Sequence, residues 1–189
     1  MSYRKGKLFV ISAPSGAGKT TLCNMLREEF PDITYSVSCT TRPPRSGETE
    51  GVHYYFVPKE AFEEKIALDD FLEYATVHGN YYGTPRSEIE KKLSGGKDIL
   101  MDIDPQGAMQ LKERFDGGIY IFIMPPSVDI LRTRLTLRND TQETIETRLA
   151  NAVVEIGYKD RYDYVVLNDE LGQAYKELSA IYKKEKGVM

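Results

Sequence analysis

Short apolar runs alternate with helical patterns along most of the chain. Such runs, bounded by turn-forming residues, occur at 8–11, 98–103, 119–123 and 164–167. Each predicts a buried strand, because the segments between them have the periodicity of helices. Strands that alternate with helices indicate a parallel sheet covered on both faces, with right-handed crossovers. Ligands of such sheets bind at the carboxyl ends of the strands.

The helical segments carry recognisable start signals. Ser127 is a candidate N-cap for a helix over about 127–138. Asp140, with Glu143 three residues later, fits a capping box for the next helix, which extends to about residue 159. Further helices are expected from Lys19 to Phe30, over 85–93 and 106–115, and after Asp169.

Residues 35–84 differ from the rest of the chain. A strand-like alternation leads into a proline-stiffened basic turn, and residues 52–57 are rich in β-formers. An amphipathic segment over 58–71 follows, and then two strand-like runs joined by a His78-Gly79 turn. We therefore expect a small, tyrosine-rich, mostly β insertion at 35–84. It would interrupt a larger α/β core made of residues 1–34, 85–126 and 152–189.

The composition fits a single soluble domain with insertions. The chain has 189 residues, 41% of them hydrophobic and 29% charged, with a net charge of −4. This acidic balance argues against adhesion to nucleic acid or anionic membranes. The two cysteines, Cys23 and Cys39, cannot form a metal quartet or a secreted disulfide framework. Neither a secretory signal nor a membrane span is recognised, so a cytoplasmic location is expected.

The loop after the first strand matches G-x-x-x-x-G-K-[ST], except that Ala13 replaces the first glycine. One methyl group fits there if Ala13 keeps a negative φ. In such a loop, backbone N–H groups and the helix N-terminus surround phosphates, Lys19 reaches the terminal phosphates, and Thr20 offers its hydroxyl to Mg²⁺. A simple turn with a surface lysine is disfavoured, because strand, loop and helix occur in the required order. The expected phosphate-binding residues are Ala13, Pro14, Ser15, Gly16, Ala17, Gly18, Lys19, Thr20 and Thr21.

A phosphate loop alone does not separate GTPases, motor ATPases and small-molecule kinases. Asp104-Pro105-Gln106-Gly107 resembles the D-x-x-G of GTPases, but no N-K-x-D motif occurs, and Asn168-Asp169 lacks the lysine. A switch GTPase is therefore disfavoured.

Two groups of arginines accompany the loop. Arg42 and Arg45 are separated by two prolines, and Arg134, Arg138 and Arg148 lie on a predicted helical hairpin. Phosphoryl transfer depends on positioning the reactants and on positive charge around the transferred group. A phosphorylated acceptor is a dianion that suits bidentate guanidinium contacts. The arginines therefore favour a kinase with a phosphorylated acceptor over simple surface charge, above all for Arg42 and Arg45.

Five segments resemble motifs of the guanylate kinase family and occur in the same order. They are residues 12–20, 36–48, 79–84, 102–107 and 166–169, and the resemblance covers essentially the whole chain. It implies a P-loop NTPase three-layer fold with a parallel sheet, a GMP-binding insertion at 35–84 and a mobile helical lid at about 127–151. It also implies transfer of the γ-phosphoryl group of ATP to GMP, and to dGMP, with Mg²⁺.

The resemblance assigns roles to individual residues. It implies that the GMP phosphate is held by Arg42, Arg45, Tyr54 and Tyr82, and that guanine is recognised by Ser38, Glu73 and Thr84. A carboxylate accepts from guanine N1–H and the 2-amino group, whereas adenine would leave it unpaired. The alternative for Glu73 is a solvated carboxylate at a strand edge, and for the tyrosines ordinary sheet aromatics.

The remaining implied roles concern the acceptor, the metal and the donor. Asp104 would approach the acceptor nucleotide, Asp102 the Mg²⁺ shell, and Asn168 and Asp169 the adenine. The lid would bring Arg134, Arg138 and Arg148 onto the triphosphate and exclude water. The turn between Arg138 and Arg148 is one residue shorter than is usual in the family.

Two other classes stay open at the sequence level. Guanylate-kinase-like domains also serve as protein-binding modules, but they typically have damaged phosphate loops, whereas Lys19 and Thr20 are present here. A kinase for another nucleoside monophosphate would require a different base pocket. ATP and GMP are the expected partners of a monomer or weak homodimer that binds neither nucleic acid nor membrane.

Overall fold

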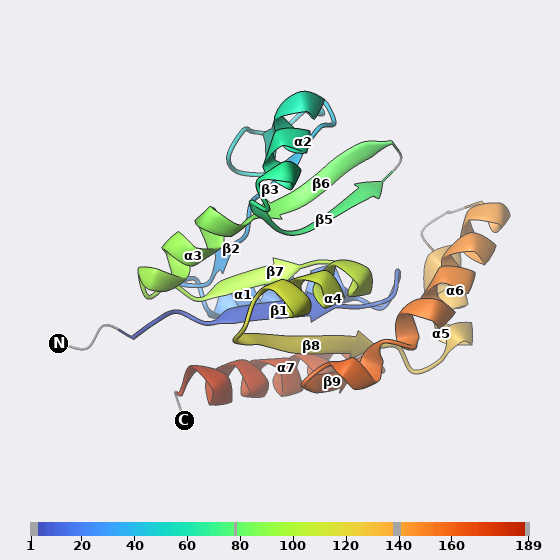
Figure 1. Ribbon diagram of the computed structural model, residues 1–189. Coiled ribbons are helices and arrows are strands. Elements are labelled where there is room, and N and C mark those ends of the chain that lie inside the picture. The colour runs from blue at the N-terminus through green and yellow to red at the C-terminus, as the bar shows by residue number, and fades with distance from the viewer. Residues whose placement is uncertain (1–3, 78, 138–140, 188–189) are drawn as a thin grey trace.

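A five-stranded parallel sheet forms the centre of the molecule (Figure 1). The computed structural model describes residues 4–77, 79–137 and 141–187. The strand order is β2-β7-β1-β8-β9, and all neighbours are parallel. The strands are β1 (Leu8–Ser12), β2 (Thr34–Tyr35), β7 (Ile99–Asp102), β8 (Gly118–Met124) and β9 (Tyr164–Leu167). The predicted α/β class with a parallel sheet is confirmed.

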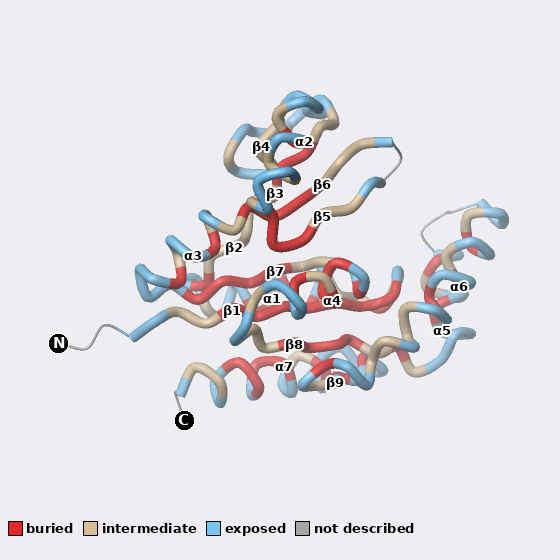
Figure 2. The backbone as a smooth tube through the Cα atoms, in the orientation of Figure 1, coloured by how far each residue is buried: buried red, intermediate tan, exposed pale blue. Residues whose placement is uncertain are grey.

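Helices cover both faces of this sheet, so the core is a strand layer between two helical layers. Phe9 and Ile11 point to one face, and Leu8 and Val10 point to the other, as strand geometry requires. The buried parts of the tube in Figure 2 follow the sheet and the inner sides of these helices. The first face packs on α1 (Lys19–Glu29) and α7 (Leu171–Lys186), and the second on α3 (Arg86–Ser94) and α4 (Pro105–Arg114).

A second, four-stranded sheet stands apart from the core in Figure 1. Its order is β4-β3-β6-β5, and one face carries α2, whose Phe62 stacks on Phe71 with ring centroids 4.3 Å apart. Of the predicted His78-Gly79 turn, Gly79 lies between the antiparallel strands β5 and β6, and His78 lies outside the described residues. The elements are β3 (Ser38–Thr40), β4 (Tyr54–Phe56), α2 (Lys59–Ala67), β5 (Phe71–Val77) and β6 (Asn80–Pro85).

The start of this second unit differs from expectation. Tyr35 pairs with Leu100, so β2 is the edge strand of the core sheet, and the second sheet begins only at Ser38. Thr34 fixes this edge because both its N–H and its hydroxyl donate to the carbonyl of Asp98. The core therefore reaches slightly further along the chain than the sequence pattern indicated.

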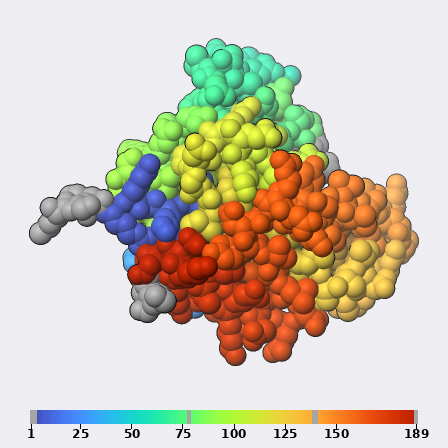
Figure 3. Space-filling model, turned by 60° about the horizontal axis from the view of Figure 1, so that its bottom comes forward, coloured from blue at the N-terminus to red at the C-terminus, as the bar shows by residue number. Residues whose placement is uncertain are grey.

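Two helices, α5 (Val128–Thr136) and α6 (Gln142–Ile156), project from the core on a different side from the second sheet (Figure 3). Ser127 caps α5 as predicted, and its hydroxyl accepts from the N–H of Ile130 at 3.2 Å. The predicted cap of α6 is wrong. Its N-cap is Thr141, whose hydroxyl accepts from the N–H of Thr144 at 3.3 Å, while Asp140 lies outside the described residues. A short 3₁₀ helix at Lys159–Arg161 then leads to β9.

The parallel arrangement brings three loops to one edge of the core sheet. They follow the carboxyl ends of β1, β7 and β9 and begin at Ala13, Ile103 and Asn168. In the part of the chain that the structure describes, no helix has the length and apolar character needed to cross a membrane.

Candidate active site

The loop between β1 and α1 has the predicted strand–loop–helix form. Gly16 and Gly18 adopt positive φ values of 87° and 90°, which other residues rarely take. A side chain at Gly18 would also place its Cβ 2.4 Å from Nδ2 of Asn168. Ala13 has no positive φ, so its methyl group fits as expected. The loop backbone is thus free to surround an anion at the start of α1.

Lys19 is anchored at the end of β7. Its Nζ lies 2.5 Å from Oδ1 of Asp102 and donates to the carbonyl of Ile103 at 3.1 Å. The hydroxyl of Tyr35 donates to the other carboxylate oxygen of Asp102 at 3.2 Å. The Asp102 side chain is 17% exposed and therefore still reachable from solvent. Tyr35 was not singled out in the sequence, and no local signal marks its contact with Asp102.

Two cavities border this loop. One, of about 310 Å³, is lined by Ala13, Ser15 and Lys19 together with Asp104 and Glu155. The other, of about 340 Å³, is lined by residues of the loop, α5 and the chain after β9. Its lining residues are Gly16, Gly18, Thr21, Arg134, Leu137, Asn168, Asp169 and Leu171.

Asn168 connects the second cavity to the loop. It is 4% exposed, and its Nδ2 donates to the carbonyl of Ala17 at 2.7 Å. Arg134 donates in turn to the backbone carbonyl of Asn168 at 2.9 Å. The family resemblance predicts that Asn168 lies beside adenine, and in the structure its side-chain amide binds the loop between β1 and α1. Asp169 is exposed at the same cavity.

A cluster of polar and aromatic side chains surrounds Arg42, which lies just after β3. Its guanidinium donates to the hydroxyl of Tyr82 at 3.2 Å, the carboxylate of Glu48 at 2.8 Å and the carbonyl of Pro43 at 2.8 Å. It also lies 5.7 Å from the ring centroid of Tyr54. The Arg42 side chain is only 12% exposed, so it is not a solvated surface arginine. Three of the four residues expected at the GMP phosphate therefore lie together.

Arg45, the fourth, is exposed on the turn that follows. Its backbone N–H donates to Glu48 at 2.7 Å, so one carboxylate binds both the Arg42 side chain and the Arg45 backbone. These hydrogen bonds lower the pKa of Glu48 to about 2. Glu48 received no role in the sequence analysis, although its position three residues after Arg45 is compatible with closing a turn.

The three predicted guanine-recognising residues form a hydrogen-bonded chain. Thr84 donates to Oε1 of Glu73 at 2.6 Å, and the hydroxyl of Ser38 lies 3.2 Å from that of Thr84. Glu73 is 7% exposed, so the solvated strand-edge alternative is wrong. Burial raises the pKa of Glu73 to about 7. A Cβ at Gly107 would lie 3.2 Å from Oε2, so the absent side chain lets α4 approach the carboxylate.

Asp104 lies between the two halves of the site. Its carboxylate caps α4 by accepting from the N–H of Gly107 at 2.8 Å. It contributes to raising the pKa of Glu73, and it also lines the cavity of the phosphate loop. Glu73, one of the residues predicted to recognise the base, and the predicted phosphate loop are therefore neighbours of the same carboxylate, that of Asp104.

Two of the three arginines predicted for the lid lie among the residues that the structure describes. Arg134 is on α5 at the second cavity, and Arg148 is half-buried on α6. Arg138 lies outside the described residues.

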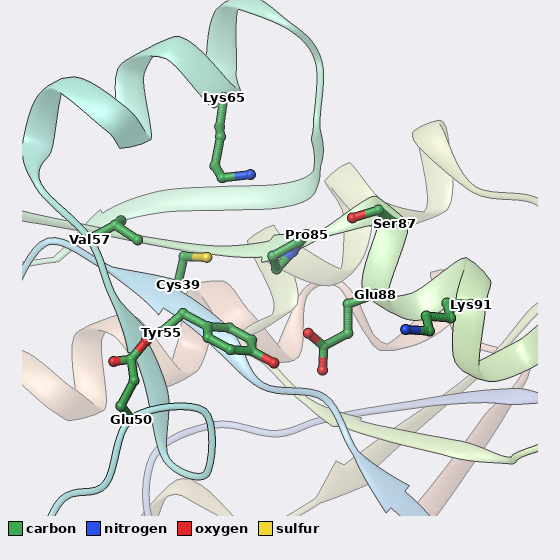
Figure 4. A pocket seen from close by; sticks show the side chains of 9 residues that line it. All are labelled: Cys39, Glu50, Tyr55, Val57, Lys65, Pro85, Ser87, Glu88 and Lys91. Atoms are coloured by element: carbon green, nitrogen blue, oxygen red, sulfur yellow. The ribbon is translucent and has the colours of Figure 1, made fainter.

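A separate cavity of about 460 Å³ is lined by residues of the second sheet, α2 and α3 (Figure 4). Cys39 of β3 contributes to it, whereas Ser38 and Thr40 point to the opposite face of the same strand. Tyr55 and Glu88 point toward one another across it (Figure 4), joining the second sheet to α3. Burial raises the pKa of the Cys39 thiol to about 11 and makes it a poor nucleophile.

Comparison with known proteins agrees with this geometry. The family model for guanylate kinase matches residues 5–185. A guanylate kinase of Clostridium perfringens is 50% identical over 183 residues, 96% of this chain and 85% of the relative. One of Carboxydothermus hydrogenoformans is 48% identical over 96% of this chain and 90% of its own. The crystal structure of guanylate kinase from Anaplasma phagocytophilum has a TM-score of 0.74 and 37% identity, over 96% of this chain and 87% of that one.

These matches span both units of the structure, the core sheet with its phosphate loop and the second sheet with its arginines and buried glutamate. They also separate the chain from switch GTPases. The chain belongs to the guanylate kinase family, and the protein is an ATP:GMP phosphotransferase.

Proposed function

We propose that residues 35–84 bind GMP, that the loop over 13–21 binds the phosphates of ATP, and that residues 127–151 act as a lid over the triphosphate. The buried chain of Glu73, Thr84 and Ser38 is the observation that carries the proposal. A carboxylate kept from water at the end of such a chain is costly unless a ligand donates hydrogen bonds to it.

Guanine supplies those donors. Its N1–H and 2-amino group face the same edge, and the two oxygens of Glu73 match that edge. Adenine offers an acceptor in place of the N1–H, so AMP would leave the carboxylate buried and unpaired. The Thr84 hydroxyl fixes the orientation of the carboxylate through its 2.6 Å hydrogen bond. Base selection therefore rests on a group positioned before the ligand arrives.

The acceptor phosphate would be held by Arg42, Arg45, Tyr54 and Tyr82. Arg42 already has its guanidinium fixed by Glu48 and Tyr82, which supports an ordered anion site. An exposed Arg45 side chain beside it is able to turn onto the phosphate. No general base is needed, because the attacking phosphate oxygen is already ionised.

The donor residues would hold the triphosphate at the start of α1. Lys19 would exchange its contact with Asp102 for the terminal phosphates of ATP, and Arg134 has guanidinium donors beyond the one used on Asn168. Arg138 and Arg148 are proposed to join them from the lid and to spread positive charge over the transferred group. The adenine would lie in the cavity beside Asn168 and Asp169.

The residues present fit a magnesium ion that accompanies ATP. Thr20 and Asp102 offer a hydroxyl and a carboxylate beside the loop, which are oxygen ligands of the kind Mg²⁺ prefers. Among the described residues, no group of three or more His, Cys, Asp or Glu side chains could hold a metal. Mg²⁺ commonly uses only one or two protein groups together with phosphates and water. When bound, it would neutralise charge on the transferred phosphoryl group.

A coupled assay of ADP release tests the acceptor assignment. Mg·ATP is offered with GMP, dGMP, AMP, UMP or no acceptor, and turnover is expected with GMP and dGMP. AMP turnover comparable to that with GMP would remove Glu73 from base selection. Both proposed nucleotide sites are built from one chain, which supports action as a monomer or weak homodimer.

A further inference from the structure

Glu155 brings a second carboxylate to the phosphate cavity from the end of α6. It lines that cavity together with the loop residues and Asp104. The backbone N–H of Ser15 contacts its carboxylate, yet among the described residues Oε2 is buried without a hydrogen-bond partner. A buried carboxylate oxygen without a donor costs free energy, so the unliganded cavity is incomplete.

The charges around Glu155 determine what can complete the cavity. Burial and the nearby negative charge of Asp104 raise the pKa of Glu155, and Lys19 lowers it. Lys19 is itself paired with Asp102. The wall of the cavity that carries Glu155 is therefore short of positive charge, although the loop beneath it is built to bind anions.

A metal-free triphosphate and a magnesium-bound one would interact differently with the Glu155 carboxylate. Phosphate oxygens are acceptors, so a bare triphosphate leaves Glu155 without a donor and adds like-charge repulsion. Mg²⁺ keeps several of its waters when it binds phosphates, and metal-bound water is a hydrogen-bond donor. Only the magnesium complex brings both charge compensation and donors to the carboxylate.

We propose that Glu155 is a specificity-determining residue that makes the donor site select Mg·ATP over metal-free ATP. This inference rests on the proposed binding of ATP with Mg²⁺ at the loop. Helix α6 carries the proposed lid residue Arg148. Through Glu155 it would also distinguish magnesium-bound ATP from metal-free ATP.

Equilibrium binding of ATP by calorimetry, without GMP, tests the proposal. Affinities are measured at pH 8 with excess Mg²⁺ and with EDTA, for wild type, Glu155→Gln, Glu155→Asp and the exposed control Glu143→Gln on the same helix. Glu155→Gln is expected to bind metal-free ATP about threefold to tenfold tighter, because it removes one like charge. Its affinity for Mg·ATP should be equal or weaker, while Glu155→Asp and Glu143→Gln should retain the wild-type preference.

Other results would overturn the assignment. If Glu155→Gln weakened both forms of ATP by the same factor, with an unchanged melting temperature, Glu155 would only hold the loop through Ser15. If Glu155→Gln kept the wild-type preference for Mg·ATP over metal-free ATP, Glu155 would also not be the residue that determines it. Thr20→Val tests the underlying metal site separately, because it should weaken Mg·ATP and spare metal-free ATP. If it weakened both equally, the metal proposal would fail whatever Glu155 does.

Discussion

Thr84 donates a 2.6 Å hydrogen bond to the carboxylate of Glu73 across two paired strands, and Glu73 is only 7% exposed. Hydrogen bonds to an ionised group favour the ionised form, but here burial has the larger effect and keeps the pKa of Glu73 raised. The raised pKa of Glu73 is of the kind found in catalytic acids, although the role proposed for Glu73 is base recognition. The proposed recognition of guanine should therefore depend on pH.

Glu73→Gln should weaken GMP far more than ATP. The amide replaces one acceptor with a donor that faces the donors of guanine, and a hydrogen bond to a charged group is worth about 1.5–3 kcal/mol. We expect the KM for GMP to rise by about 10- to 100-fold, while the KM for ATP stays within about twofold. Initial rates with each nucleotide varied in turn measure both constants. Equal changes in the two would place Glu73 outside the base pocket.

The same substitution should alter how stability depends on pH. The folded-state pKa of Glu73, about 7, lies above the ordinary value of 4.5, so its contribution is complete below 4.5 and is lost as pH rises through 7. Relative to Glu73→Gln, the wild type should lose on the order of 3 kcal/mol of unfolding free energy between pH 4.5 and 8. Urea unfolding of both proteins across that range tests it. If the unfolding free energies of the two proteins changed in parallel with pH, Glu73 would be ionised throughout this pH range.

Lys19→Ala should nearly abolish phosphoryl transfer and spare GMP binding. Lys19 contacts Asp102 and Ile103 in the core, whereas most of the residues proposed to bind GMP lie in the second sheet and its turns. Loss of one charge-stabilising donor costs about 10²- to 10³-fold in kcat. Calorimetric titration with GMP should give a Kd within about twofold of wild type. A large loss of GMP affinity would contradict the separation of donor and acceptor sites.

Glu48 should act as a positioning residue for the acceptor phosphate. Glu48→Ala releases the Arg42 guanidinium and the Arg45 backbone together, and we expect the KM for GMP to rise by about threefold to tenfold without change for ATP. Glu48→Gln keeps one acceptor but turns an amide donor toward the second N–H, so it should restore only part of the affinity. Because the pKa of Glu48 is about 2, the effect should be constant from pH 5 to 8. Tighter GMP binding in Glu48→Ala would mean that Glu48 competes with the phosphate.

Asn168→Asp should weaken ATP through the loop. The substitution removes the Nδ2 donor to the carbonyl of Ala17 and places a carboxylate oxygen near that carbonyl. We expect the KM for ATP to rise by about tenfold, with GMP unchanged and some loss of thermal stability. Asp169→Asn, at the exposed neighbouring position, is the control. If both variants had the same effect, contact with adenine rather than support of the loop would explain Asn168.

Local rules explain why much of the architecture could be predicted. The phosphate loop needs positive φ at Gly16 and Gly18, and such glycines are visible in sequence. Ser127 begins a helix because its hydroxyl accepts an N–H three residues later. The predicted α6 cap is wrong because Asp140 and Thr141 are adjacent capping residues, and sequence alone does not rank them.

Contacts between distant segments could not be predicted in this way. Asn168 and Ala17 are 151 positions apart, and Tyr35 and Asp102 are 67 apart, so no spacing rule relates them. Glu155 received no role from the sequence, because no local pattern marks it among the charges of α6. The burial of Glu73 also depends on tertiary packing, and its recognition role came from family resemblance.

The chain leaves and re-enters the core at nearly the same point, because Lys92 of α3, the helix that follows the second sheet, donates to the carbonyl of Tyr35 at the end of β2. An intervening segment whose ends meet can be exchanged with little disturbance to its host. The proposed acceptor site would then lie largely on an exchangeable segment, whereas the proposed ATP site would stay in the core. Grafting the corresponding segment from a kinase with another base preference is then a way to change acceptor selectivity without rebuilding the donor half.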